Sequence, residues 1–186
     1  MTRALFALVA GLSISPALYA MPVNYSIATD RTAIALSWRA FGHLSQAHLA
    51  GVTGDVTLDP QKETNDRIAV KIPVATLDTA NSLLTWQMKG GMFFDASRYP
   101  WIVFTSSRVV PQGQGHFRVF GSLSVKDVQR PAILDVTLKE HGNTPGSGED
   151  LVLQASTAIS RSAFNMGSFP ALVDDRVAID IQARVL

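Results

Sequence analysis

The feature that most limits the fold of this chain is an alternation of apolar and polar residues, which starts at Val23 and continues almost to the end. A period of two places the apolar side chains on one face of a β-strand. Turn signals such as Asp59-Pro60 and the stretch 111–115 interrupt the alternation at the ~8–12-residue spacing typical of sandwiches and barrels. Since most connections have hairpin length, the pattern predicts an all-β fold with about eight strands in an antiparallel meander. The main apolar stripes are Ile34, Leu36 and Trp38; Ile68, Val70 and Ile72; Phe117, Val119, Leu123 and Val125; Ala132, Leu134, Val136 and Leu138; Leu151, Leu153, Ala155 and Ile159; and Val177, Ile179, Ile181, Ala183 and Val185.

The pattern also predicts where two irregular segments lie. Residues 42–46 are expected to form a loop, and residues 48–58 a single long strand in which Gly51 and Gly54 are bend points. The alternation stops between Thr76 and Gly90, where Asp78 or Thr79 can cap a helix. We therefore predict one short helix near residues 79–90.

Eight strands that close on themselves enclose an interior that either is filled by side chains or holds one small ligand. Several bulky residues lie outside the expected strands, in the helix and in the segments 92–94 and 164–169. This distribution favours a barrel whose large apolar side chains gather at one mouth, although plain core packing is an equally good role for them. The candidate ligand-binding residues of the lumen and mouth are Trp38, Phe41, Leu84, Met88, Met92, Phe93, Phe94, Trp101, Phe104, Phe164, Met166 and Phe169.

Two arginines near these aromatic segments are candidates for contact with a polar head group. Arg161 follows a strand and precedes an aromatic loop, and Arg98 lies in the connection before Trp101. A guanidinium can bind an anionic group through two parallel hydrogen bonds. Its five donors can equally pin a loop through backbone carbonyls, which is the role we favour for Arg161. For Arg98 a solvated surface position is the favoured alternative.

The first twenty residues have the layout of a secretory signal peptide. A positive start at Arg3 precedes the short apolar run 4–14, and Pro16 breaks the run before a small-residue site at Ala20. An N-terminal membrane anchor is the alternative, but the run is shorter than the ~20 residues that span a bilayer. We expect residues 1–20 to be a cleaved signal and residues 21–186 to be one exported domain.

Charge and cysteine content exclude several classes of function. Without Arg3 the expected mature chain has 15 basic and 15 acidic residues, a balance that gives it no electrostatic preference for nucleic acid. The chain has no cysteine, which excludes disulfides, thiol catalysis and thiolate metal sites. After the signal there is no apolar run of ~18 residues, so we expect no stable membrane insertion.

Signals for catalysis or metal binding are weak in this sequence. His43 and His48 are five residues apart, a spacing that fits neither a helical nor a strand pair of metal ligands, and His116 and His141 have no second ligand nearby. Neither a Gly-x-Ser-x-Gly nor a Ser-x-x-Lys motif is present. We therefore predict no catalytic residues, no metal and no cofactor, and a protein that is not an enzyme.

Three motifs in the expected order resemble those of the YceI-like polyisoprenoid-binding family. Residues 92–106 resemble its FFDxxxYPxIxFxS motif, and residues 121–131 its GxLTIKGVTRP turn. Residues 159–164 with 173–177 are similar to its IxRSDFG…VGDxV ending, with Asn165 in place of a glycine. Asn tolerates the left-handed backbone conformation better than most residues. The resemblance implies a lipocalin-like, eight-stranded antiparallel barrel, exported to the periplasm, that holds a long isoprenoid or similar amphipathic lipid in its lumen.

We therefore predict a non-enzymatic periplasmic carrier for a polyprenyl, quinone or fatty-acid type of lipid. The alternatives are a lipid-acting hydrolase or isomerase on the same barrel, an outer-membrane barrel, and a structural or stress-response protein with a filled core. An acidic or histidine side chain inside the lumen is the feature that distinguishes the enzyme from the carrier. The expected partner is the lipid itself, and the sequence leaves open whether the protein also forms a homodimer.

Overall fold

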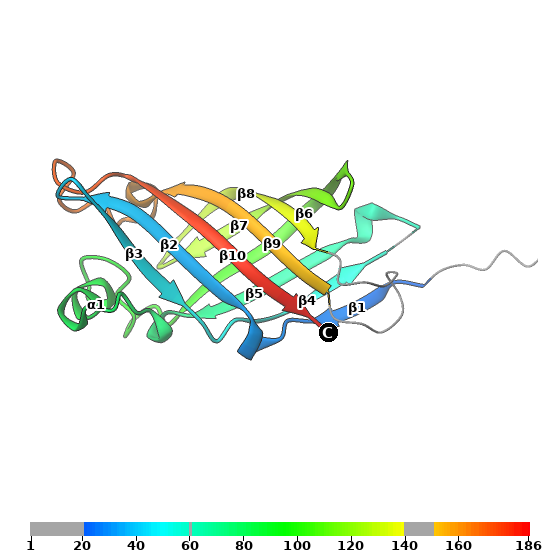
Figure 1. Cartoon of the computed structure of the whole chain (residues 1–186), viewed down its shortest axis with the longest axis horizontal. Helices are drawn as coiled ribbons and strands as arrows, with labels where there is room; N and C mark the ends of the chain where they lie inside the picture. The colour runs from blue at the N-terminus through cyan, green and yellow to red at the C-terminus, as the bar shows by residue number, and fades with distance from the viewer. Residues whose placement is uncertain (1–20, 60, 140–150) are drawn as a thin grey trace, which may run out of the picture.

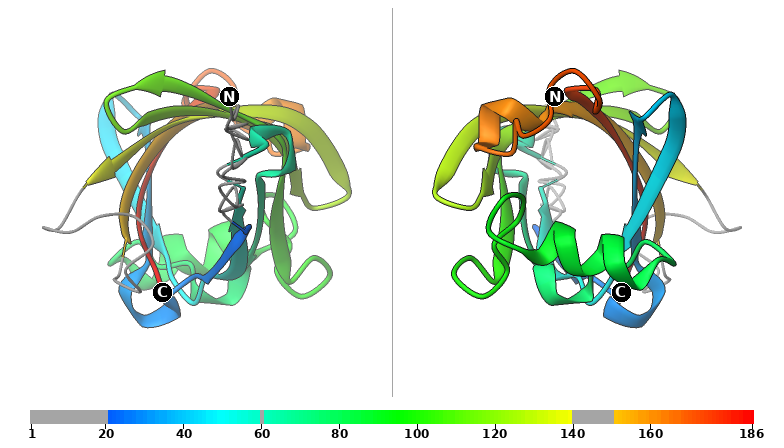
Figure 2. Two further views of the ribbon diagram at one scale, coloured as in Figure 1. Left: turned by 90° about the vertical axis from the view of Figure 1, so that its right-hand side faces the viewer. Right: turned by 90° about the vertical axis from the view of Figure 1, so that its left-hand side faces the viewer.

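The computed structural model describes residues 21–59, 61–139 and 151–186. The expected signal peptide and His141 lie outside the described residues. Within them the chain forms one antiparallel sheet, which curls around the long axis of the molecule (Figures 1 and 2). The prediction of an all-β antiparallel barrel with one short helix is confirmed. Its strands are β1 (Val23–Ser26), β2 (Ala33–Ala40), β3 (His43–Leu49), β4 (Thr53–Leu58), β5 (Arg67–Pro73), β6 (Trp101–Gly113), β7 (His116–Val125), β8 (Val128–Lys139), β9 (Leu151–Ser160) and β10 (Arg176–Val185).

The strand order follows the predicted meander. Strands β4 to β10 lie side by side in sequence order, β2 and β3 continue beyond β10, and β1 pairs with β4. The last strand therefore lies next to the second one, as a curled sheet requires. At one end the sheet closes further, because Ser26 and Leu186 exchange two backbone hydrogen bonds of 2.9 Å and the N–H of Ala28 donates to the carbonyl of Arg184 at 2.8 Å.

The described sheet has ten strands, whereas the sequence predicted about eight, and the main difference lies between residues 42 and 58. The predicted loop 42–46 is wrong: β3 already begins at His43, and the turn from β2 consists of Phe41 and Gly42, both with positive φ. The predicted single strand 48–58 is also wrong, because the chain turns at Gly51, whose φ is +67°. A Cβ atom there would lie 3.0 Å from Cγ of Pro73, so the turn needs glycine for its conformation and for space.

The helix α1 spans Ser82–Lys89 and begins later than predicted. Its N-cap is Asn81, whose Oδ1 accepts a hydrogen bond from the N–H of Leu84 at 3.0 Å, so the prediction of Asp78 or Thr79 as the cap was wrong. Asp78 instead pairs with His48 through the backbone, in two hydrogen bonds of 2.7 and 3.0 Å. These bonds extend the edge of β3 toward α1, which lies across one side of the barrel at this end (Figure 2).

Four short 3-10 turns complete the described structure, namely η1 (Thr29–Arg31), η2 (Glu63–Asn65), η3 (Val74–Thr76) and η4 (Arg161–Phe164). Asn165 follows η4 with a φ of 58°, the left-handed conformation in which an Asn replaces glycine at low cost. None of the described helices is both long and apolar enough to cross a membrane.

Candidate functional site

The inside of the curled sheet is a cavity of about 710 Å³. Strands β2 and β5 to β10 each contribute alternate residues to its wall, which is the consequence of a period of two on a closed surface. The register brings the stripes into contact: Ala155 of β9 pairs with Val136 of β8 and with Ile181 of β10, and all three line the cavity. Most residues of the predicted stripes therefore line this cavity, while Phe117, Leu138 and Leu151 do not.

The wall of this cavity is almost entirely apolar. Of the described residues that line it, Arg161 carries a charge, and Thr32, Ser45, Gln87 and Thr157 are polar without one. No Asp, Glu or His is among these lining residues. In the part of the chain that the structure describes, no three His, Asp or Glu side chains come close enough to hold a metal ion.

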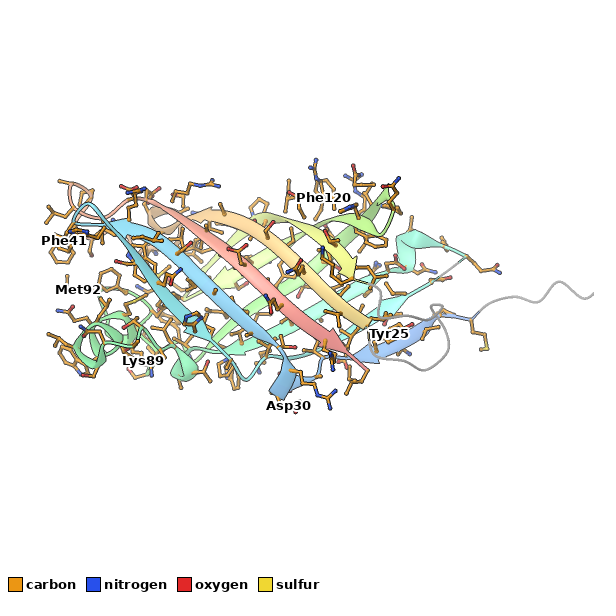
Figure 3. The ribbon with its side chains drawn as sticks, viewed as in Figure 1. Tyr25, Asp30, Phe41, Lys89, Met92 and Phe120 are labelled. Carbon is orange, nitrogen blue, oxygen red and sulfur yellow. The ribbon has the colours of Figure 1, made fainter. Side chains whose placement is uncertain are left out.

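The end of the barrel next to α1 is the mouth of the cavity, and three segments distant in sequence meet there. They are the β2–β3 turn, the segment from α1 to residue 94, and the loop between η4 and β10. The N–H of Phe41 donates to the carbonyl of Leu172 at 2.7 Å, which joins the first segment to the third. Phe41 and Met92 lie at this end, and Tyr25 lies toward the other (Figure 3). Exposed apolar side chains from all three segments, among them Phe41, Met92 and Leu172, thus line the cavity at this end.

The segment Met92–Phe94 forms a tight turn between α1 and β6. The N–H of Phe94 donates to the carbonyl of Met88 at 3.0 Å, and the N–H of Asp95 donates to the carbonyl of Gly90 at 2.9 Å. Phe94 is buried, Phe93 is partly buried and Met92 is exposed, yet all three line the cavity. The turn thus places a graded series of apolar side chains along the wall, from the interior outward.

Ten of the twelve predicted lumen and mouth residues line the cavity, and two do not. Trp101 starts β6 on the outer side of the sheet, where the Lys71 ammonium lies 4.5 Å from its ring centroid. Phe164 is buried in η4 and is not among the lining residues. Ligand binding by any of the twelve stays a prediction. The ten lining residues are Trp38, Phe41, Leu84, Met88, Met92, Phe93, Phe94, Phe104, Met166 and Phe169.

Arg161 is 5% exposed and holds the loop that follows it. Its Nε donates to the carbonyl of Asp174 at 2.9 Å, and its Nη2 donates to that of Val173 at 2.7 Å. Its Nη1 donates to the carbonyls of Ser168, at 2.7 Å, and Met166. Four of the five guanidinium N–H groups are thus directed at backbone carbonyls, the loop-pinning arrangement that we favoured from the sequence.

Arg98 lies away from the cavity wall. Its guanidinium is exposed and stacks near the ring of its neighbour Tyr99, 5.3 Å from the centroid. The structure therefore does not bring Arg98 and Arg161 together, and contact of either with a head group stays a prediction.

A carboxylate fixes the start of the same loop from outside. Asp175 accepts hydrogen bonds from the hydroxyl of Ser160 and, at 2.8 Å, from the N–H of Ser162. These bonds hold the pKa of the Asp175 carboxyl below its ordinary value, since they stabilise the ionised form. At the opposite end of the barrel, hydrogen bonds from the Asn65 amide and the Gln61 N–H likewise lower the pKa of Asp59.

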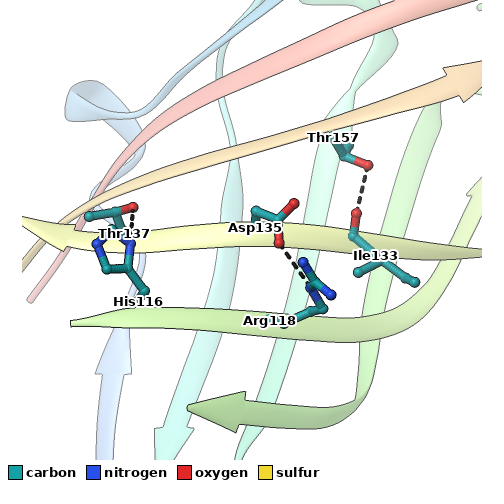
Figure 4. A network of polar contacts seen from close by, with 6 residues as sticks. All are labelled: His116, Arg118, Ile133, Asp135, Thr137 and Thr157. Carbon is teal, nitrogen blue, oxygen red and sulfur yellow. Dashed lines mark hydrogen bonds and ion pairs between the residues drawn. The ribbon is translucent and has the colours of Figure 1, made fainter. Parts of the chain in front are cut away.

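The outer face of β7 and β8 carries a small polar network (Figure 4). Arg118 Nε donates to Asp135 Oδ1 at 3.0 Å, and the Thr137 hydroxyl lies 3.0 Å from Nδ1 of His116. Exposed charge pairs of this kind contribute little to stability, about 0–1 kcal/mol. The outer face of these strands is thus more polar than the inner one, although Ile133 of β8 is 47% exposed there.

Our list of site residues omitted most of the strand residues that form the wall, such as Ile34, Val70 and Ile179. The signal that identifies them was present, since each belongs to an alternating stripe. The list also omitted Leu172 and Gln87 at the mouth. Neither belongs to a stripe, so no periodicity pointed to them.

Comparison with known proteins relates the whole barrel to one family. The model of the YceI-like domain matches residues 25–185. A UPF0312 protein of Photorhabdus laumondii is 29% identical over 167 residues, which cover 88% of this chain and 86% of that protein. A UPF0312 protein of Vibrio parahaemolyticus is 24% identical over 170 residues, 89% of each chain.

Solved structures share the fold at lower identity. The crystal structure of Burkholderia cenocepacia BcnA has a TM-score of 0.76 at 23% identity and covers 85% of this chain and 98% of its own. A polyisoprenoid-binding domain from Saccharophagus degradans, implicated in plant cell wall breakdown, has a TM-score of 0.66 at 12% identity and covers 87% of this chain and 97% of its own. At these identities the likeness concerns the fold alone.

Proposed function

The chain belongs to the YceI-like domain family, and on that premise we propose that it is a non-enzymatic carrier, exported to the periplasm. Its ligand is the tail of a long isoprenoid or related amphipathic lipid of the polyprenyl, quinone or fatty-acid type, held in the barrel cavity. The name of the Saccharophagus degradans domain, which describes polyisoprenoid binding by that protein, supports the choice of ligand class.

The observation that carries this proposal is the chemistry of the cavity wall. A volume of about 710 Å³ lies within the ~300–1,000 Å³ of small-molecule sites, and its wall is far more apolar than a site for a polar metabolite. Each Å² of apolar surface removed from water contributes ~25 cal/mol, so a tail that buries ~400 Å² gains about 10 kcal/mol before the costs of ordering. The cavity can therefore hold an apolar tail without any charged contact.

The polar end of such a lipid belongs at the mouth. Gln87 of α1 is exposed there and lines the cavity, so its amide is available to a hydroxyl, carbonyl or carboxylate at the opening. Arg161 has one guanidinium N–H beyond the four that hold the loop. We expect the head group to depend on Gln87 and solvent more than on Arg161.

The carrier and the enzyme differ in what happens to the lipid. The wall offers no described carboxylate or imidazole that could act as an acid or base, which supports the carrier. We expect a bound prenyl lipid, quinone or fatty acid to be recovered unchanged after prolonged incubation. Mass spectrometry of the extracted lipid measures this, and a product formed in proportion to protein concentration would support the enzyme instead.

A cavity-filling variant tests the location of the ligand. Ala155 points into the cavity and Ala158 lies on the outer side of the same strand, so the two residues form a matched pair. We expect Ala155→Phe to fold normally, because its ring enters open space, and to weaken lipid binding by at least about tenfold, equivalent to ~1.4 kcal/mol. Ala158→Phe is the control and should bind as the unmodified protein does.

Binding is followed by tryptophan fluorescence during titration of delipidated protein with a prenyl alcohol, a quinone and a fatty acid. Trp38 and Trp86 line the cavity whereas Trp101 does not, so Trp38→Phe should remove more of the signal than Trp101→Phe. A flat response to all three lipids, or equal weakening by Ala155→Phe and Ala158→Phe, would contradict the proposal. Cell fractionation, with determination of the mature N-terminus by mass spectrometry, tests the periplasmic location.

A further inference from the structure

Five large apolar residues at the mouth are both exposed to solvent and part of the cavity wall, and we call them the rim. They come from the three segments that meet there, so they surround the opening instead of forming a stripe on one element. The rim consists of Phe41 (67% exposed), Trp86 (73%), Met92 (55%), Phe169 (48%) and Leu172 (49%). An apolar surface is therefore continuous from the cavity to the outside of the molecule.

Two rim residues have a backbone conformation that is unfavourable for large side chains. Phe41 has a φ of 53° and Phe169 a φ of 59°, in the left-handed region that bulky residues rarely adopt. Asn165, four residues before Phe169, shows which residue type accepts such a φ easily. Two aromatic side chains are thus kept in solvent and in an unfavourable conformation, although a smaller polar residue would remove both costs.

We propose that the rim docks reversibly onto a lipid bilayer, with its side chains at the boundary between head groups and acyl chains. This inference rests on the proposed function, because a lipid that enters the cavity has to leave a membrane first. Trp, Phe, Met and Leu are residues that enter this boundary when they are presented on a surface. With the mouth against the bilayer, the lipid tail stays in contact with apolar surface throughout its transfer.

The size of the rim favours a lipid surface over a second copy of the chain. A large aromatic side chain buries ~150–250 Å², so five residues about half exposed or more offer roughly 500–600 Å² in total. A stable protein interface needs ~800 Å² from each partner. A second copy on the rim would also close the opening through which the ligand has to pass.

The charges around the rim indicate which lipids it accepts. Lys89 lies on one of the three segments and Arg39 is two residues before another. However, Asp174 and Asp175 lie on the third segment, and Asp95 directly follows residue 94. Because both signs are present, docking is expected to depend on apolar insertion and little on anionic head groups. It should therefore occur on zwitterionic bilayers and change little with salt, since screening weakens charge attraction and not apolar burial.

Flotation with lipid vesicles tests the proposal. The purified protein, with its N-terminus determined by mass spectrometry, is mixed with phosphatidylcholine vesicles or with vesicles containing phosphatidylglycerol as well. The variants are Trp86→Ser and the double variant Phe41→Asn, Phe169→Asn, since Asn accepts the left-handed backbone at both positions. Ile133→Ser is the matched control, because Ile133 is similarly exposed but lies on β8 away from the cavity wall. Circular dichroism checks that each variant is folded.

We expect the unmodified protein and Ile133→Ser to float equally with both kinds of vesicle, and each rim variant to show a partition coefficient lowered by roughly tenfold or more. Flotation that is absent, or equal in rim variants and control, would overturn the docking proposal. So would a rim-dependent dimer in sedimentation analysis that does not bind vesicles. Saturable lipid binding by the unmodified protein in vesicle-free titration shows whether the proposed function stands when docking fails.

Discussion

The ring of Phe104 on β6 lies directly against the backbone of Gly121 on β7, so closely that a Cβ atom on Gly121 would be 2.5 Å from Cζ of Phe104. The same Cβ would lie 2.5 Å from the carbonyl oxygen of Thr105. Phe104 is buried and lines the cavity. The absence of a side chain at Gly121 thus leaves room for the Phe104 ring, and the ring in turn covers the backbone at this glycine.

We predict that Gly121→Ala destabilises the protein, although an alanine in a strand is otherwise better than glycine by ~0.5–1 kcal/mol. Moving a buried ring costs about 1–3 kcal/mol, so the net loss in the free energy of unfolding should be ~1–2 kcal/mol. Urea unfolding measures it. Gly91→Ala is the control, since nothing lies within 4 Å of its Cβ position. Adding Phe104→Leu should recover part of the loss, because it removes the contact between the new Cβ and the ring. Recovery should be incomplete, since the contact with the Thr105 carbonyl oxygen persists. No recovery would contradict the role given to the ring.

A second prediction concerns Arg161. Arg161→Lys keeps the charge, but a single ammonium cannot reach four carbonyls that a planar fork satisfies together. We expect a loss of about 2–3 kcal/mol in the free energy of unfolding and faster hydrogen exchange at Met166, whose N–H donates to the Arg161 carbonyl at 3.1 Å. Arg98→Ala, at an exposed site, should cost less than ~1 kcal/mol. An unchanged stability of Arg161→Lys together with weaker lipid binding would instead assign Arg161 to the head group.

The alternation of residues was sufficient to predict the fold class and the meander, because a stripe on each strand can be buried only if the sheet curls around it. It could not predict the division of residues 48–58, because a glycine fits both the apolar and the polar positions of an alternating strand. The turn at Gly51 becomes visible only from its positive φ and from the lack of space for a Cβ atom beside Pro73. The early start of β3 comes from the tight turn at Phe41 and Gly42, which pairs Ala40 with His43. Phe41 is a residue type that rarely adopts the positive φ of such a turn, so no turn signal was present in the sequence at that position.

The alternation of residues could also predict part of the candidate site. Ile102 and Phe104 face inward, so parity places Trp101 outside, and applying the alternation to aromatic residues would have excluded it. Aromatic character alone led to its inclusion. Leu172 reaches the mouth through a backbone hydrogen bond to Phe41, 131 positions earlier in the chain, which no sequence pattern records. The role of Arg161 was predicted correctly, because a guanidinium with five donors in a fixed geometry can satisfy the backbone carbonyls of an irregular loop that follows it in the sequence.

The start of α1 gives a third prediction, with the wrongly predicted cap as its control. Asn81→Ala removes the acceptor of the Leu84 N–H, and we expect a loss of about 1 kcal/mol in the free energy of unfolding. Asp78→Ala should change it by less than ~0.5 kcal/mol, because Asp78 pairs with His48 through its backbone alone. Thermal and urea unfolding measure both. Equal losses, or a larger loss at Asp78, would show that the cap lies where the sequence first suggested.

The fourth prediction is a pH dependence that the carboxyl of Asp175 causes. The hydrogen bond from Ser160 and that from the Ser162 N–H lower the pKa of this group in the folded protein, whereas the unfolded chain has an ordinary value of ~3.9. A lowered folded pKa gives a stabilisation that is present above the unfolded pKa and is lost as the pH falls through the folded pKa. We therefore expect the urea midpoint to fall between about pH 5 and pH 2.

Ser160→Ala tests this dependence, because it removes the hydrogen bond that contributes most to the lowered pKa. In this variant the pKa of Asp175, followed through its carboxyl carbon by NMR, should move up toward the ordinary value. Stability should be lower than in the unmodified protein near pH 6 and should converge with it near pH 2, while Asp59 maintains part of the slope. Ser156→Ala, on the same strand β9, is the control and should leave the Asp175 titration unchanged. A Ser160→Ala titration curve that coincides with the unmodified one would remove Ser160 as the cause.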